Sequence, residues 1–116
     1  MDAKLHVIGS GTPSPTKERW GSCFVLEIPD EQIMIDCGPA STYKMILMDL
    51  DPKNVTNLFF THHHSDHDLD YPCFLLTRWE TSIGIEENLN IYGPPPTELL
   101  TKRLIDLYNG AFSHDF

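Results

Sequence analysis

The chain has 116 residues, of which 41% are hydrophobic and 22% are charged, a balance typical of one small soluble globular domain. No apolar run is long enough to span a bilayer, and the N-terminus lacks the basic and apolar regions of a signal peptide. We therefore expect a cytoplasmic protein that does not bind membranes. The formal net charge of −9, from 17 acidic and 8 basic residues, argues against a large phosphate-binding surface.

The three cysteines, Cys23, Cys37 and Cys73, are odd in number and far apart, and no C-x-x-C pair is present. This spacing argues against a disulfide framework and against a zinc site made of thiolates. We expect three buried, reduced thiols.

The N-terminal third predicts strands. Residues 3–9 mix β-branched and apolar side chains and form the first predicted strand, and residues 10–21 form a loop rich in glycine and proline. Two further strands are predicted at residues 22–28 and 31–37. The Pro-Asp pair at residues 29–30 is a turn signal, so these two strands are close enough to form a hairpin.

Residues 38–50 change to a helical period. Their apolar residues at i, i+3, i+4 and i+7 predict an amphipathic helix whose buried stripe is Tyr43, Ile46, Leu47 and Leu50. Ser41 or Thr42 could cap this helix at its N-terminus, and Pro52 ends it.

The remaining elements alternate between strand and helix. Residues 54–62 predict a strand, residues 71–80 a helix that starts near a proline, and residues 87–93 a fifth strand. Residues 97–110 predict a helix with Thr97 as its N-cap. Its apolar face is expected to consist of Leu100, Leu104, Leu107 and Tyr108.

This order predicts an α/β fold, in the form of one mixed sheet with helices on one face. The first three strands are joined by short connections, and the later strands are separated by helices. The sequence shows no internal repeat and no linker that would divide it, so residues 1–116 are expected to form one unit.

Residues 59–72, FFTHHHSDHDLDYP, hold four of the six histidines of the chain. His62, His64, Asp66 and His67 form the pattern H-x-H-x-D-H directly after a predicted strand. In an extended segment, residues at i and i+2 point to the same side, so His62 and His64 can reach one metal ion together. If the chain then turns into a helix, Asp66 and His67 can serve a second ion.

Imidazole and carboxylate groups are ligands for zinc, and also for iron, manganese or nickel. Bound cations would explain why so many of these groups can be crowded together. The alternatives are a solvated histidine loop or the remnant of a purification tag, but a tag is usually terminal and lacks aspartates. His63 should point away from the pair and be structural, and Asp68 and Asp70 should be exposed or support the ligands. His6 is expected to be structural and His114 to lie in an exposed tail.

The segment LFFTHHHSDH resembles the signature of the metallo-β-lactamase fold superfamily. The flanking segments VIGSGTPSPTKERWGSCFVLE, IMIDCGPAS and YGPP resemble its ribonuclease Z-like and arylsulfatase-like branch. The resemblance implies a four-layer αβ/βα sandwich built from two similar halves, of which residues 1–116 are the N-terminal half with the metal-binding loop at 62–68. It also implies that the other half supplies a further histidine, a bridging aspartate and a last histidine, which this chain lacks.

The resemblance also implies roles for individual residues. His62 and His64 match ligands of the first metal, and Asp66 and His67 match ligands of the second. Asp66 also matches the catalytic residue that orients or deprotonates the attacking water. Asp36 matches an aspartate that hydrogen-bonds a ligand histidine, and the alternative from the residues alone is a strand-end cap or a turn residue.

These expectations lead to a metal-dependent hydrolase of the dinuclear zinc type, which cleaves a phosphodiester, sulfate ester or related anionic ester through a metal-activated hydroxide. The first alternative is a ribonuclease Z-like endonuclease that processes tRNA 3′ ends, against which the acidic charge and the DCGPAS segment argue mildly. The second is a non-catalytic metal-binding module, and iron or manganese could replace zinc. Since half of the site is missing, we expect this chain to be inactive and to associate with itself or with the missing C-terminal half.

Overall fold

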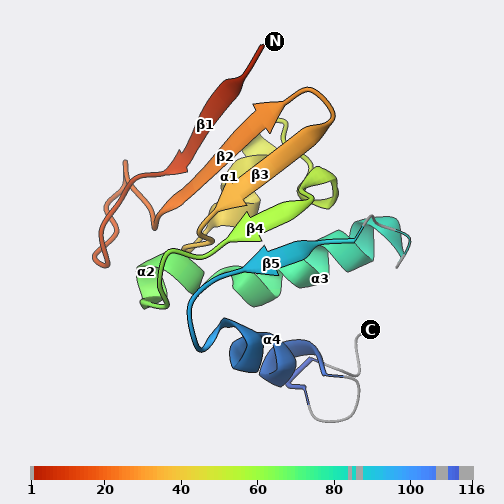
Figure 1. The fold of residues 1–116 in the computed structure, drawn as a ribbon. Coiled ribbons are helices and arrows are strands. Elements are labelled where there is room, and N and C mark those ends of the chain that lie inside the picture. The colour runs from red at the N-terminus through yellow and green to blue at the C-terminus, as the bar shows by residue number, and fades with distance from the viewer. Residues whose placement is uncertain (1, 84, 86–87, 107–109, 113–116) are drawn as a thin grey trace.

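The structure is a computed structural model that describes residues 2–83, 85, 88–106 and 110–112 (Figure 1). Within these residues, five strands form one sheet in the order β1-β2-β3-β4-β5. The strands are β1 (Lys4–Gly9), β2 (Cys23–Ile28), β3 (Glu31–Ile35), β4 (Asn57–Phe59) and β5 (Asn90–Tyr92). The helical elements are α1 (Ser41–Leu47), the 3-10 turn η1 (Pro52–Asn54), α2 (Ser65–Asp68), α3 (Tyr71–Ser82) and α4 (Thr97–Ile105).

The sheet is mixed, as predicted. Strands β1, β2 and β3 pair antiparallel, whereas β3, β4 and β5 pair parallel. Parallel neighbours need a crossover connection, and α1 and α3 lie in the two crossovers. The C-terminal ends of β3 and β4 therefore meet at one edge of the sheet, where the predicted site residues follow them.

One face of the sheet carries the core. Helices α1 and α3 lie behind the sheet in Figure 1, and α4 lies beyond the β5 edge. The inward-facing positions of the central strands are fully buried and apolar, as Val25, Met34 and Leu58 show, and they lie in register across the sheet. Tyr71 and Phe74 from α3 complete this core.

The other face of the sheet is turned toward the viewer in Figure 1, and no described helix covers it. Strand side chains alternate between faces, so the pairing register gives the members of this open face. They are mostly apolar: Leu5, Val7, Phe24, Leu26, Ile33, Ile35, Phe59 and Tyr92. Leu5 and Val7 are 61% and 50% exposed, and the rings of Phe59 and Tyr92 stack at 4.7 Å. We call this set the open face.

The prediction for α1 was wrong in its buried face. The helix is shorter than 38–50 and buries Ser41, Thr42 and Met45, whereas three of the four predicted stripe residues, Tyr43, Ile46 and Leu47, are exposed. Hydrogen bonds to Asp70 explain which face of the helix is buried. The Asp70 carboxylate accepts hydrogen bonds from the Thr42 amide at 2.7 Å and from the Thr42 hydroxyl at 2.5 Å. These bonds turn the Thr42 side of the helix inward.

The predicted caps of two helices also differ from the structure. Ser41 and Thr42 lie inside α1, whose N-cap is Ala40 at φ 67°. Thr97 is the first residue of α4, and Pro96 is its N-cap. Leu100 and Leu104 pack against the core as predicted, whereas Leu107 and Tyr108 lie outside the described residues.

The strand predicted at 54–62 is reduced to three residues. Its first residue, Asn54, ends η1, and the residues on either side of Asn54 are held by α3. The buried guanidinium of Arg78 on α3 donates to the carbonyls of Pro52 at 2.9 Å and Val55 at 2.6 Å. These bonds hold the entry to β4 against α3 rather than in the sheet. The last residues of the predicted strand form the extended loop that carries the histidines.

The cysteine prediction holds for two of the three residues. Cys23 and Cys37 are buried in the core, whereas Cys73 is exposed on α3, and all three are free thiols. Within the described ranges, no helix is both long and apolar enough to cross a membrane.

Candidate metal centre

The four predicted ligand residues come together in the loop between β4 and α3. His64 is extended, with φ −83° and ψ 153°, and α2 begins at the next residue, as the spacing predicted. The His62 ring lies 4.6 Å from the His64 ring and 4.1 Å from the His67 ring, measured between centroids. Oδ2 of Asp66 lies 3.3 Å from Nε2 of His67. Their role as ligands stays a prediction.

Asp36 fixes the base of this cluster. It follows β3 directly, adopts φ 62° and is only 2% exposed. Its Oδ1 accepts the backbone N–H of Thr61 at 2.8 Å, and its Oδ2 accepts the Thr61 hydroxyl at 2.7 Å and Nδ1–H of His67 at 2.7 Å. The contact with a predicted ligand histidine is the one that the resemblance implied, and the two contacts with Thr61 were not foreseen.

This network assigns the tautomers of two histidines. Because His67 donates its Nδ1–H to Asp36, its neutral ring keeps a lone pair on Nε2. The Thr61 hydroxyl donates to Asp36, so its oxygen accepts Nδ1–H of His62 at 3.0 Å, which leaves Nε2 of His62 with the free lone pair. Both rings are thus prepared to bind a cation through Nε2.

Thr61 is the residue of the candidate site that sequence reasoning missed. The signal for it was a hydroxyl side chain directly before the first histidine of the motif. That signal is weak, because the partner that gives Thr61 its role, Asp36, lies 25 residues earlier in the chain.

Backbone contacts hold the loop to neighbouring turns. The Ser22 N–H donates to the Asp66 carbonyl at 2.8 Å, and the Cys37 N–H donates to the His67 carbonyl at 2.7 Å. A Cβ atom on Gly38 would collide with the Asp66 carbonyl oxygen, and one on Gly21 would lie 2.8 Å from it. Because glycine has no side chain at these two positions, the backbone at Gly21, at Gly38 and at Asp66 can come into direct contact.

The remaining acidic and histidine candidates lie outside the cluster. His63 turns away from His62 and contacts Asp68 and Thr97, as a structural residue should. Asp70 supports α1 instead, and burial raises its pKa above the ordinary 3.8, while hydrogen bonds from Thr42 oppose that shift. His6 lies 3.4 Å from Glu27 on the paired strand. The predicted tail residue His114 lies outside the described residues.

The thiols are poor candidates for ligands. Burial raises the pKa of Cys23 to about 12 and the pKa of Cys37 well above its usual value, so both stay protonated. The donor set is therefore imidazole and carboxylate, which suits zinc and also iron or manganese.

In the side-chain positions seen here, no group of three or more His, Cys, Asp or Glu among the described residues is arranged to hold a metal ion. Oδ2 of Asp66 and Nε2 of His67, two of the predicted donor atoms, lie 3.3 Å apart without a hydrogen bond between them. The chemistry of the donor set still suits a cation, because the Nδ1 bonds leave the Nε2 lone pairs of His62 and His67 available. The residues present fit a metal ion that would replace the Asp66–His67 contact.

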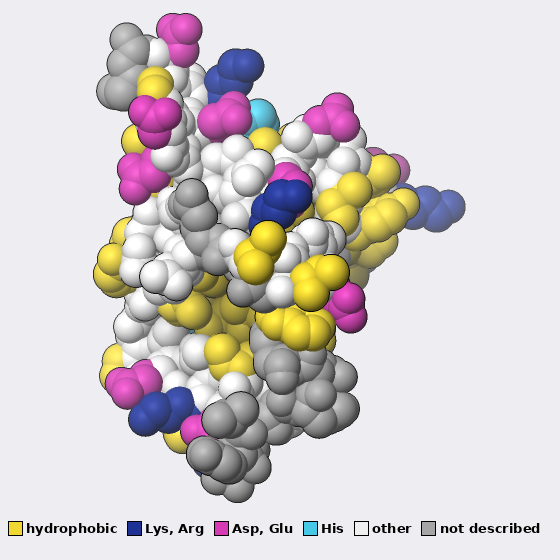
Figure 2. Space-filling model, turned by 90° about the vertical axis from the view of Figure 1, so that its right-hand side faces the viewer, with side chains coloured by type: hydrophobic (Ala, Val, Ile, Leu, Met, Phe, Trp, Pro, Cys, Tyr) yellow, Lys and Arg dark blue, Asp and Glu magenta, His cyan; other side chains and the backbone are white. Residues whose placement is uncertain are grey.

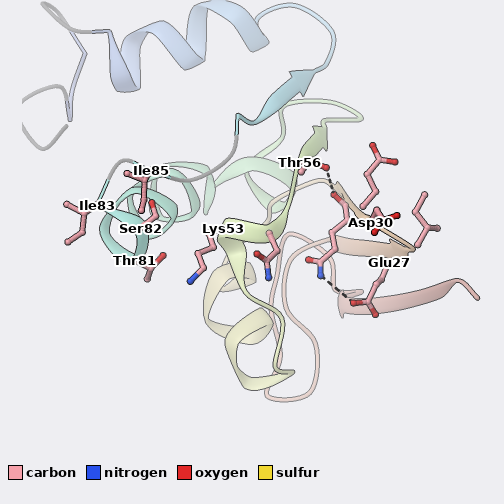
Figure 3. A pocket seen from close by; sticks show the side chains of 12 residues that line it. Glu27, Asp30, Lys53, Thr56, Thr81, Ser82, Ile83 and Ile85 are labelled. Atoms are coloured by element: carbon pink, nitrogen blue, oxygen red, sulfur yellow. Dashed lines mark hydrogen bonds between the residues drawn. The ribbon is translucent and has the colours of Figure 1, made fainter.

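Three hollows in the described part of the surface lie away from the histidines. One of about 730 Å³ is lined by Glu27, Asp30, Lys53, Thr81 and Ile83 at the end of the sheet opposite to the histidines (Figure 3). Two others lie along β5 and α4, and the predicted ligands line none of the three. Acidic side chains are spread over the face shown in Figure 2, where lysines and arginines are few and separate.

Comparison with known proteins decides the family. The family model described as the metallo-β-lactamase superfamily matches residues 18–113. The chain belongs to this superfamily. The match spans most of the sheet, the histidine loop and α4, and it confirms the resemblance drawn from the LFFTHHHSDH segment.

Within the metallo-β-lactamase superfamily, proteins similar to this chain include ribonucleases Z. One from Methanothermobacter thermautotrophicus is 35% identical over 113 residues, which are 97% of this chain and 36% of that protein. One from Methanococcus maripaludis is 33% identical over 113 residues and 35% of its length. The chain thus spans about a third of the length of the relatives it matches.

Solved structures of the superfamily share the fold. The short form of human tRNase Z gives a TM-score of 0.81 at 27% identity, over 94% of this chain and 42% of that one. The metallo-β-lactamase fold protein YhfI from Bacillus subtilis gives 0.77 at 23% identity, over 92% and 44%.

Proposed function

We propose that these residues form one side of the active site of a metal-dependent hydrolase of the dinuclear zinc type, acting on a phosphodiester, sulfate ester or related anionic ester. The observation that carries the proposal is the Asp36–Thr61 network, which leaves Nε2 of both His62 and His67 available for a cation. Ligand histidines usually donate their other ring N–H to a carboxylate or a similar acceptor, as His67 does to Asp36.

Each residue then has a task. His62 and His64 hold the first ion, and Asp66 and His67 hold the second. The carboxylate of Asp66 also orients the attacking water and accepts its proton. In other enzymes, such a general base raises the reaction rate about 10²–10⁴-fold. Two bound metal ions supply Lewis acidity and lower the pKa of water, which makes hydrolysis possible at neutral pH.

The other walls of the site are proposed to come from further parts of a protein as long as its relatives. The chain spans about a third of their length, and none of the three hollows described above opens at the histidines. Residues 1–116 are proposed to be the N-terminal half of the catalytic domain, and its location is proposed to be the cytoplasm.

A second candidate is an endonuclease that processes tRNA 3′ ends. The relatives named ribonuclease Z, at 33–35% identity, favour it. The net charge of −9 counts against a broad RNA surface on this part of the protein, so the RNA contacts would have to be made by other segments.

The test uses the whole protein as its gene encodes it. We expect purified protein to contain close to two zinc ions and to hydrolyse bis(p-nitrophenyl) phosphate, and Asp66→Asn to lower kcat by about 10²–10⁴ because its general base is lost. His6→Asn, at a histidine bonded to a carboxylate on β2, is the matched control and should keep full activity.

The assay also separates the candidates. Faster cleavage of a precursor tRNA than of the small phosphodiester supports the endonuclease. Metal binding with no turnover of any ester would leave only the non-catalytic module, and a protein that binds no zinc, iron or manganese contradicts the proposal.

A further inference from the structure

His63, the central histidine of the loop, is bonded more extensively than its neighbours. Its side chain is 8% exposed, and its ring packs on Phe60 with 4.8 Å between centroids. Its Nδ1 lies 3.0 Å from Oδ2 of Asp68, and its Nε2 lies 2.6 Å from the hydroxyl of Thr97. Both ring nitrogens are therefore engaged, and His63 is no ligand in this arrangement.

The Asp68 bond connects the two halves of the motif. Asp68 ends α2, the helix that carries Asp66 and His67, whereas His63 lies in the extended segment between His62 and His64. The side-chain bond from residue 63 to residue 68 thus closes a ring that contains one residue of the first pair and both of the second. Because the His63–Asp68 bond is short, it limits how far the His62–His64 pair can move from the Asp66–His67 pair.

The Thr97 bond anchors the same ring to the turn after the next strand. Thr97 is 6% exposed, begins α4 and donates its hydroxyl to the Pro94 carbonyl at 2.6 Å. A Cβ atom on Gly93 would collide with that hydroxyl, so the turn after β5 is shaped to admit it. The chain segments after β4 and β5 are joined here through one histidine.

The direction of the His63 ring has a direct effect on its neighbours. In an extended segment, alternate side chains point to opposite sides, so a ring held inward on residue 63 holds residues 62 and 64 outward. The 4.6 Å separation and 82° angle of the His62 and His64 rings agree with this geometry.

We propose that His63 is a positioning residue that sets the separation between the His62–His64 pair and the Asp66–His67 pair, and that its bond to Asp68 is the part that does so. The inference rests on the proposed function, because it assumes that the two pairs bind metal. It assigns a task to the one motif histidine that the ligand set leaves out.

The experiment measures metal binding in the whole protein, with Co²⁺ as the probe. His63→Phe keeps a buried ring on Phe60 but loses both hydrogen bonds. We expect it to bind Co²⁺ about 10–100-fold more weakly and to shift the visible absorption of the bound ion, as loss of a residue that orients ligands does. His6→Phe, on β1, is the matched control and should change neither quantity.

Two conservative variants separate the two bonds. The amide group of the asparagine in His63→Asn can donate to Asp68 in place of Nδ1 of the histidine. We expect this variant to recover most of the Co²⁺ affinity and of the visible spectrum. His63→Gln places its amide toward Thr97 and should stay weak. Recovery by the glutamine variant and not by the asparagine variant would overturn the role of the Asp68 bond.

Asp68→Ala removes the other partner of the His63–Asp68 hydrogen bond, so the inference can still be tested if His63→Phe fails to fold. It should weaken Co²⁺ binding as His63→Phe does, and the double variant should be no weaker than either single one. Affinity and spectrum unchanged in both Asp68→Ala and His63→Phe overturn the inference. If the unaltered protein itself binds no Co²⁺, the proposed function fails instead.

Discussion

Asp36 shows how much of the centre depends on a residue outside the histidine motif. Its φ of 62° lies in the left-handed region, which aspartate and asparagine tolerate better than most residues. This conformation turns the carboxylate from the end of β3 toward Thr61 and His67. Three donors converge on it, so the buried charge is well satisfied.

We predict that Asp36→Asn lowers metal affinity about 10–100-fold, the usual cost of removing a partner that orients a ligand histidine. Asparagine keeps the φ value and the volume, but its amide group presents N–H donors to groups that already donate. Competition with a chelator in the whole protein measures the affinity. Asp49→Asn, at an exposed aspartate with φ 60°, is the matched control, and an equal loss there would contradict the prediction.

At the scale of single residues, the sequence predicted the features that depend only on neighbouring positions in the chain. The alternation of His62 and His64 and the turn into Asp66 and His67 depend only on backbone period, and the structure has that geometry. The role of Thr61 was not predictable, because it comes from a carboxylate brought near by the pairing of β3 with β4.

At the scale of elements, α1 shows where a periodic pattern fails. The stripe from Tyr43 to Leu50 has the spacing of an amphipathic helix. A helix of seven residues can bury only a few side chains, however, and the hydrogen bonds from Thr42 to Asp70 determine which side chains are buried. The mixed sheet was predictable because strand spacing and crossover length can be read from the sequence. The shortness of β4 was not, since it depends on Arg78 reaching η1 from α3.

We predict a pH dependence of stability from Asp70. Burial raises its pKa above 3.8, so over the range from 3.8 to the native pKa the folded state binds more protons than the unfolded state. The contribution of Asp70 to stability therefore falls as pH rises through that range. Asp70→Asn keeps an acceptor for Thr42 without the charge, so its stability should fall less over the same range.

Urea unfolding of the whole protein at a series of pH values gives the comparison, as the difference between variant and unaltered protein at each pH. Glu80→Gln removes an exposed carboxylate from α3, the helix whose N-cap is Asp70, and serves as the control. A pH profile of Asp70→Asn that runs parallel to that of the unaltered protein would refute the assignment.

At the scale of the whole molecule, the open face is the dominant feature. It is a mostly apolar surface across all five strands, with Leu5, Val7, Phe59 and Tyr92 at least 41% exposed. Soluble proteins rarely expose a contiguous apolar surface of this kind unless another surface packs on it.

We predict that a polypeptide of residues 1–116, produced alone, self-associates through the open face and hydrolyses esters at a negligible rate. Light scattering coupled to size exclusion measures its mass, and a hydrophobic dye reports the exposed surface. Val7→Glu on β1 should reduce association, whereas Tyr43→Glu, on α1 and 64% exposed, should not. A monomer that binds no dye, or turnover at ordinary enzyme rates, would show the prediction to be wrong.

The meeting of Gly21, Gly38 and the Asp66 carbonyl limits how the protein can move. Backbone that touches backbone leaves no compressible side chain between the segments, so the histidine loop, the turn after β3 and the start of β2 shift together or not at all. The exposed stretch 12–19 leads into this meeting point from outside, so a change in its position does not by itself displace the histidine loop.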